Sequence, residues 1–131
     1  MSDVVSLAQT LVRMDTAGLG EGAAAEMLGR RLTAAGARVE IVPFGPGRAH
    51  LIATAGHPGD PPLVCSGHLD TVPAGETPWS RDPLSGELED GWLHGRGSAD
   101  MKSGVAALVV AFEKHLSRGT PGRGIMLALT A

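Results

Sequence analysis

The chain has 131 residues, a formal net charge of −3, 43% hydrophobic residues and a single cysteine. This length fits one domain with a buried core, and no apolar run approaches the ~18 residues of a membrane span, which argues against a membrane protein. The acidic balance without a basic cluster argues against nucleic acid as a partner, and one cysteine excludes an internal disulfide and a multi-thiolate zinc site.

The first part of the chain predicts two helices. Apolar residues recur at helical spacing over residues 4–14 and again over about 21–35, where Gly36 is a natural C-terminal stop. The N-terminus carries an early acid, Asp3, and no basic region. We therefore expect no signal peptide and a cytoplasmic location.

Strands are predicted next. Polar and apolar residues alternate over 38–43, and a second strand is expected over 49–55, after the Pro46-Gly47 turn. The short apolar segment 63–65 is bounded by turn signals, which favours a strand covered on both faces.

The second half of the chain adds a hairpin, a helix and a strand. Asp90-Gly91 signals a tight turn within a hairpin over 87–94, and helical spacing predicts a helix over 101–118. Residues 125–129 are all apolar and predict another fully buried strand. Because strands alternate with helices, the predicted fold class is α/β, with a mostly parallel or mixed sheet and helices on its faces.

His68 and Asp70 follow the short apolar strand and are two residues apart. In extended geometry both side chains project the same way. A metal-bound histidine normally donates its other ring proton to a carboxylate, so Asp70 is either that partner or a ligand itself. A loop histidine satisfied by a neighbouring aspartate is an equally good interpretation of these two residues alone.

Asp100 follows a segment of small residues, Gly95-Arg96-Gly97-Ser98-Ala99, and precedes the predicted helix. A helix N-cap is the simplest explanation for this aspartate, but it leaves the two glycines and the flanking Lys102 unexplained. A phosphate-binding loop is a competing interpretation. It is weakened because Asp100 stands where the third glycine of a dinucleotide fingerprint belongs, and a carboxylate repels phosphate.

Together these residues resemble the M20 family of metallopeptidases and amidohydrolases. Three segments carry the resemblance, in this order and spacing: Ser66-Gly67-His68-Leu69-Asp70-Thr71-Val72-Pro73, then Trp79 with Asp82-Pro83, then Gly95-Arg96-Gly97-Ser98-Ala99-Asp100-Met101-Lys102. The first and third segments are each fairly specific. Weaker similarity covers the N-terminal helices and the last strand.

The resemblance implies a role for each site residue. His68 is similar to a ligand of one metal ion, Asp100 to the carboxylate that bridges two divalent ions, and Asp70 to the residue that orients His68. The family's ions are usually zinc, sometimes cobalt or manganese, and they activate a water that cleaves an amide bond. The implied substrates are N-acyl amino acids or small peptides.

The resemblance also implies that residues 1–131 are the N-terminal portion of an incomplete catalytic domain with a zinc-exopeptidase-like fold. In the family, an acidic run with the general base follows the last strand, and a separate lid or dimerisation domain follows later. We therefore expect this chain alone to be inactive, and a homodimer only in the full-length protein. Two alternatives stay open: a non-catalytic metal- or partner-binding remnant of the fold, and a small nucleotide-binding domain built on the Gly95 loop.

Overall fold

The computed structural model describes residues 3–18, 20–57, 59, 61–119 and 122–131. Its elements, in chain order, are α1 (Asp3–Arg13), α2 (Glu21–Ala34), β1 (Arg38–Gly45), β2 (Arg48–Ala55), β3 (Leu63–His68), β4 (Leu88–Glu89), β5 (Trp92–Leu93), the short kinked turn η1 (Ser98–Lys102), α3 (Ser103–Leu116) and β6 (Ile125–Thr130). Of the helices in the described part of the chain, none is both long and apolar enough to span a bilayer.

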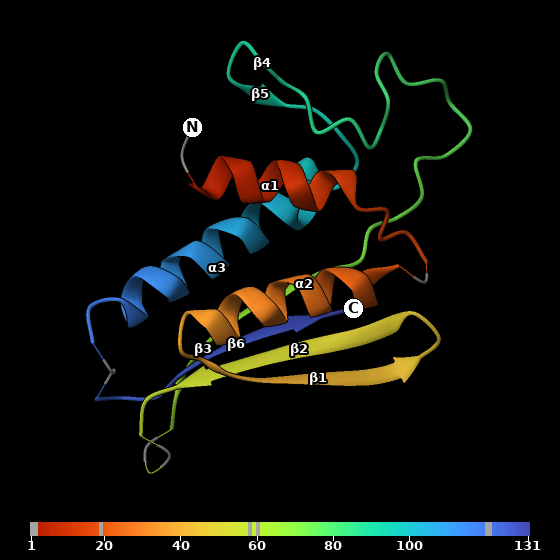
Figure 1. Cartoon of the computed structure of the whole chain (residues 1–131). Helices are drawn as coiled ribbons and strands as arrows, with labels where there is room; N and C mark the ends of the chain where they lie inside the picture. Colours follow the sequence, from red (N-terminus) through yellow and green to blue (C-terminus); the bar gives the residue numbers. More distant parts are fainter. Residues whose placement is uncertain (1–2, 19, 58, 60, 120–121) are drawn as a thin grey trace.

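The main sheet is mixed, with strand order β1-β2-β6-β3 (Figure 1). β1 pairs antiparallel with β2, and β2 pairs antiparallel with β6, whereas β3 and β6 run parallel. The prediction of a mostly parallel or mixed sheet is therefore confirmed, and the sheet is of the mixed kind. A tight turn between β1 and β2 permits only antiparallel pairing, while the long connection through α3 allows β6 to return parallel to β3.

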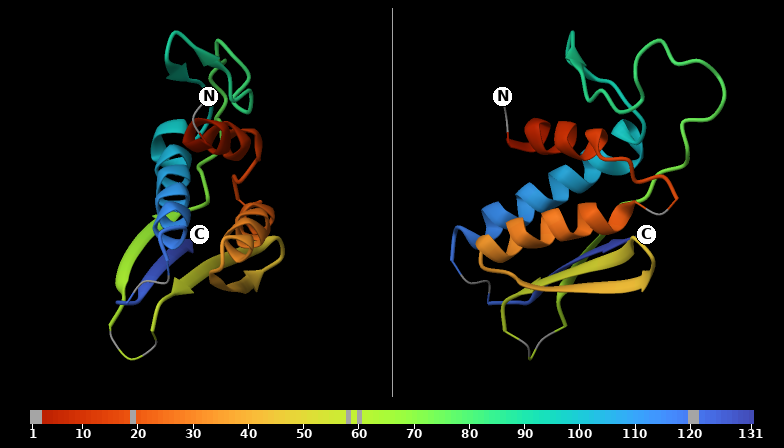
Figure 2. Two further views of the ribbon diagram at one scale, coloured as in Figure 1. Left: turned by 60° about the vertical axis from the view of Figure 1, so that its left-hand side comes forward. Right: turned by 45° about the vertical axis from the view of Figure 1, so that its right-hand side comes forward.

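The three helices gather on one face of this sheet, as the two turned views show (Figure 2). α2 packs directly on β1 and β2, so close that a Cβ built on Gly29 would lie 3.1 Å from Ile41 Cδ1. The core between the layers contains side chains from the helices and the sheet that are fully shielded from solvent: Leu28, Leu32, Leu51, Val109, Leu127 and Leu129.

β3 and β6 are covered on one face, not on both as predicted. Leu63 and Val64 of β3 are 61% and 53% exposed. In β6, Leu127 is buried whereas its neighbour Met126 is only half-buried. The uninterrupted apolar runs suggested helices on both faces, but the helices of the described chain lie on one face, and β3 is at the edge of the sheet.

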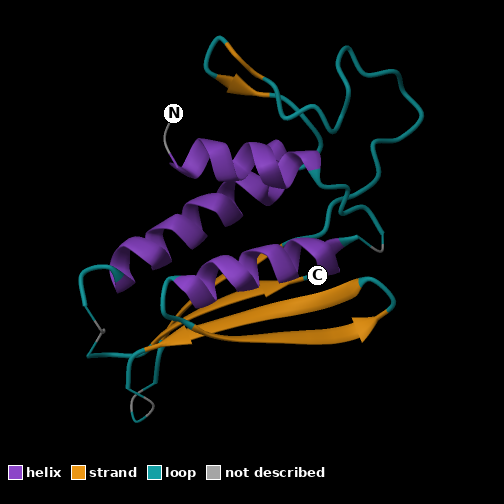
Figure 3. Ribbon diagram, in the orientation of Figure 1, coloured by secondary structure: helices purple, strands orange, loops and turns teal. Residues whose placement is uncertain are grey.

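The β4–β5 hairpin and the long loop before it lie beyond the helices, away from the sheet (Figure 3). The structure confirms the hairpin predicted around Asp90-Gly91, with Leu88 paired to Leu93 and Glu89 to Trp92. The loop returns the chain from the end of β3 to η1 at the start of α3. The segment that contains Asp100 is thereby brought next to the end of β3, where His68 lies.

The open face of the sheet predicts self-association of the isolated 131-residue chain. Val64 lies beside Met126 on the face opposite the buried Leu127, and Val64 is 53% exposed. Contiguous exposed apolar surface and an unpaired strand edge favour aggregation. We expect sedimentation velocity to show oligomers that Val64→Lys reduces, whereas a monomeric chain with a sharp cooperative melt would contradict the prediction.

Candidate functional site

The candidate site lies where β3 ends and α3 begins. β3 ends at His68, and η1, which precedes α3 directly, contains Asp100. A pocket of about 280 Å³ is lined by residues of both segments, including His68, Asp70, Thr71, Gly97 and Asp100. The topology thus brings together two sequence segments that are more than thirty positions apart.

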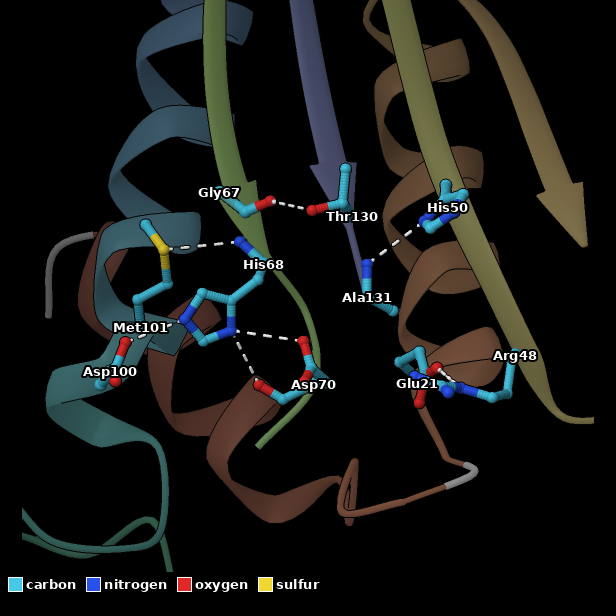
Figure 4. A network of polar contacts seen from close by, with 10 residues as sticks. All are labelled: Glu21, Arg48, His50, Gly67, His68, Asp70, Asp100, Met101, Thr130 and Ala131. Atoms are coloured by element: carbon cyan, nitrogen blue, oxygen red, sulfur yellow. Dashed lines mark hydrogen bonds and ion pairs between the residues drawn. The ribbon is translucent and has the colours of Figure 1, made fainter. Parts of the chain in front are cut away.

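His68 and Asp100 are in direct contact. His68 Nε2 lies 2.8 Å from Asp100 Oδ1, and the close-up view shows the imidazole and the carboxylate pointing toward each other (Figure 4). The Asp100 side chain is 86% exposed and that of His68 is 36% exposed. Because water screens so open a pair, it adds little to fold stability, and its atoms remain accessible to a ligand.

Asp70 lies on the other side of the His68 ring. His68 Nδ1 is 2.9 Å from the backbone carbonyl oxygen of Asp70 and 3.4 Å from its carboxylate Oδ1. The backbone carbonyl is therefore the nearer acceptor, and the carboxylate supports it at longer range. This contact fixes the ring in one orientation, with Nε2 directed at Asp100.

Both ring nitrogens of His68 face atoms that can only accept a hydrogen bond. Nδ1 donates its proton to the Asp70 carbonyl, so Nε2 can satisfy the Asp100 carboxylate only as a second N–H donor. Consistent with this geometry, the hydrogen bond to Asp100 raises the pKa of His68 above its ordinary value, although partial burial acts in the opposite direction. A neutral ring would instead present a lone pair to the carboxylate.

Asp100 is not a helix N-cap, although the sequence allowed that interpretation. Asp100 and Met101 have non-helical dihedral angles, and the residue that precedes α3 is Lys102, which makes no side-chain capping bond. The predicted helix over 101–118 accordingly begins at Ser103. The Asp100 carboxylate is therefore free of the helix terminus and directed at His68.

Met101 anchors η1 to the end of β3. The backbone N–H of His68 donates to Met101 Sδ at 3.4 Å. A Cβ built on Gly67 would lie 3.1 Å from Met101 Cε, so a larger residue there would displace the methionine by a few tenths of an ångström. Met101 belongs to the third segment of the family resemblance, but its contact with His68 was not predicted from the sequence.

Arg96 anchors the long loop between β3 and β4. Its guanidinium carbon lies 4.9 Å from the centre of the Trp79 ring, and its backbone N–H donates to the Pro83 carbonyl at 2.7 Å. The Trp79 indole N–H also donates to the Ala74 carbonyl, at 3.0 Å. Arg96 itself lines the pocket. The loop that connects β3 to the β4–β5 hairpin is therefore held by several contacts.

The donor pair fits a divalent cation but does not complete its coordination. Among the described residues, no group of three or more histidine, cysteine, aspartate or glutamate side chains is arranged to hold a metal ion. However, an imidazole Nε2 that has lost its proton and a carboxylate beside it are ligands preferred by zinc-like ions. A catalytic zinc site uses about three protein ligands, so this pair would be part of a site.

Comparisons with known proteins point in one direction. A model of the family described as "Peptidase family M20/M25/M40" matches residues 64–131, which include His68, Asp70 and Asp100. The chain is 42% identical over 129 residues to the succinyl-diaminopimelate desuccinylase of Methylorubrum extorquens, covering 95% of this chain and 33% of that protein. It is also 42% identical over 122 residues to the desuccinylase of Bradyrhizobium diazoefficiens, covering 89% of this chain and 31% of that protein. The chain therefore spans about a third of the length of these curated relatives.

Solved structures share the fold at lower identity. The M20 family metallo-carboxypeptidase Sso-CP2 from Sulfolobus solfataricus superposes with a TM-score of 0.85 at 18% identity, over 99% of this chain and 31% of that one. A glutaminyl cyclase from Bacteroides thetaiotaomicron superposes with a TM-score of 0.67 at 17% identity, over 97% of this chain and 44% of that one. These neighbours carry different activities in their names, so the likeness shows the fold alone.

Proposed function

Since the chain belongs to peptidase family M20/M25/M40, we propose that its protein is a metal-dependent hydrolase of amide bonds whose metal centre includes His68 and Asp100. The observation that carries this proposal is the 2.8 Å contact between His68 Nε2 and Asp100 Oδ1 at the end of β3. Imidazole and carboxylate groups that converge at a strand end, in a pocket open to solvent, form the kind of site that such a reaction needs.

In this proposal His68 binds one divalent ion and Asp100 bridges two, with zinc, cobalt or manganese as the ions. A metal pair bound there would lower the pKa of a water toward about 7 and polarise the scissile carbonyl. The accessible Asp100 carboxylate supports a bridging role, because its second oxygen, Oδ2, has no hydrogen-bond partner among the described contacts.

The contribution of Asp70 is to orient His68. Its carbonyl accepts the Nδ1 proton at 2.9 Å, which favours the neutral tautomer with a free Nε2 lone pair. The carboxylate at 3.4 Å increases the basicity of the ring. Both effects favour metal binding at Nε2.

The names of the relatives suggest the substrate. Two that are 42% identical to this chain are succinyl-diaminopimelate desuccinylases. We propose N-succinyl amino acids as the first substrates to test, within the broader class of N-acyl amino acids and small peptides. Hydrolysis of such an amide gives a carboxylate and an amine.

The complete protein, not these 131 residues, is proposed to carry the activity. This chain spans about a third of its relatives, and its described residues place only two ligands together. We propose that it forms the N-terminal portion of the catalytic domain, with the general base, further ligands and any lid or dimerisation domain elsewhere in the protein. The proposed location of the protein is the cytoplasm.

The test uses the complete protein that contains this chain. After metal removal with a chelator, we expect hydrolysis of N-succinyl and N-acetyl amino acids to stop, and to return when Zn²⁺ or Co²⁺ is added. Turnover that survives complete metal removal would refute the proposal. Tight metal binding without turnover of any acylated amino acid or peptide would favour the non-catalytic alternative.

Metal binding is expected to weaken as the pH falls. A proton on His68 Nε2 occupies the position of the ion, and the Asp100 hydrogen bond raises the pKa of that ring above 6.5. The affinity for Co²⁺ should therefore rise by up to about tenfold per pH unit while His68 is protonated, and level off above the raised pKa. Titrations across this pH range measure it, and an affinity already constant below about pH 6 would contradict it.

A further inference from the structure

Lys102 is a buried lysine close to the candidate site. Lys102 is only 2% exposed. It is the last residue of η1 and follows Asp100 by two positions. Burial disfavours the charged ammonium and lowers the pKa of Lys102 to about 8, with Asp15 acting in the opposite direction. Lysines are almost never fully buried unless they are paired, so this burial requires a compensating contact.

The compensating contact is made with the end of α1. Lys102 Nζ donates a hydrogen bond to the Met14 carbonyl oxygen at 2.6 Å. Met14 follows directly after α1, which ends at Arg13, so the ammonium lies at the negative end of the helix dipole. The contact joins residues 88 positions apart in the chain.

The same connection between α1 and α2 also holds the loop that contains Asp70. The Thr71 backbone N–H donates to the Thr16 carbonyl at 3.2 Å, and Ala17 forms an isolated bridge with Thr71. Residues 14–17 therefore contact both halves of the site. One contact reaches the segment after His68, and the other reaches the segment that carries Asp100.

We propose that Lys102 is a positioning residue that fixes Asp100 opposite His68 by tying η1 to the connection after α1. It does not touch the metal or the substrate. This inference rests on the proposed metal centre. It gives a role to Lys102, which the sequence left unexplained. An apolar side chain of the same length would fill the same space without the free-energy cost of burying an amine. We therefore attribute the effect of Lys102 to its hydrogen bond and not to its packing.

The test compares Lys102→Met with Lys114→Met in the complete protein. Methionine keeps the length of the side chain but removes the donor, whereas Lys114 is an exposed residue of α3. We expect Lys102→Met to weaken Co²⁺ binding by about 10–100-fold, the range seen when a residue that orients a metal ligand is lost, and to change the visible spectrum of bound Co²⁺. Lys114→Met should change neither.

Each outcome has one interpretation. An unchanged Co²⁺ affinity and spectrum in Lys102→Met would overturn the inference. If that variant does not fold, Lys102→Arg, which keeps an N–H donor, should fold and still bind Co²⁺. Failure of both to fold would assign Lys102 to the core and overturn the inference as well.

A parent protein that binds no Co²⁺ would refute the proposed function, not this inference. The crystal structure of metal-free Lys102→Met would then decide. We expect the contact between His68 Nε2 and Asp100 Oδ1, 2.8 Å in the parent, to be lost. Retention of that contact would show that Lys102 does not position Asp100.

Discussion

Replacement of His68 by alanine in the complete protein is expected to abolish divalent metal binding at this site and the hydrolysis that depends on it. His68 supplies the only imidazole of the pair and lies 2.8 Å from Asp100. Loss of an outer-shell partner typically costs about 10–100-fold, so loss of a coordinating atom should cost more than about 100-fold in kcat/KM and in Co²⁺ affinity. Asp100→Ala should have an effect of the same size.

The fold should survive these substitutions, which makes the result specific. The His68 side chain is 36% exposed and that of Asp100 is 86% exposed, so neither is part of the core. His115→Ala, at an exposed position of α3, is the matched control and should leave metal binding unchanged. Circular dichroism and thermal melting of each variant provide the check. Parent-like metal affinity in His68→Ala would remove the basis of the proposed centre.

Asp70→Ala offers a finer comparison. The substitution removes the carboxylate at 3.4 Å but keeps the backbone carbonyl, which accepts the Nδ1 proton at 2.9 Å. We therefore expect a smaller loss than for His68→Ala, on the order of tenfold in metal affinity. A loss as large as that of His68→Ala would mean that the Asp70 carboxylate is itself a ligand.

Gly97→Ala is expected to disrupt the site through a steric clash. Gly97 has φ of 78°, and a Cβ there would lie 2.5 Å from Thr71 Cγ2 and 3.2 Å from Lys102 Cδ. The added methyl must push apart the segments that carry Asp70 and Asp100. We expect Co²⁺ affinity to fall by more than about tenfold, with a loss of stability larger than the ~1–2 kcal/mol of the left-handed conformation alone.

Gly91→Ala separates the clash from the backbone strain. Gly91 has φ of 82°, close to that of Gly97, but a Cβ there would meet no atom within 4 Å. It lies in the turn of the β4–β5 hairpin. The control should therefore lose only ~1–2 kcal/mol and keep its metal affinity, measured by denaturant unfolding and by titration. Equal effects of the two substitutions on Co²⁺ binding would contradict the steric explanation.

Much of the local structure could be predicted from the sequence. Periodic apolar residues indicated α1 and α2 within a residue or two, and Asp90-Gly91 indicated the hairpin. The approximate positions of the strands followed from turn residues and alternation. These features depend on side chains only a few positions apart, and the sequence displays such spacing directly.

The sequence by itself determined the helices, the strands and the segments that contain His68, Asp70 and Asp100. Only the tertiary structure decided the strand order and direction, the exposure of β3, and the 2.8 Å approach of His68 to Asp100. It also decided the partner of buried Lys102, a backbone carbonyl 88 positions away. The reason is physical. The spacing of side chains determines local conformation, whereas the neighbours of a strand and the acceptor of a buried lysine depend on contacts between distant segments. Every residue has a backbone carbonyl, so the sequence does not indicate which one accepts a given hydrogen bond.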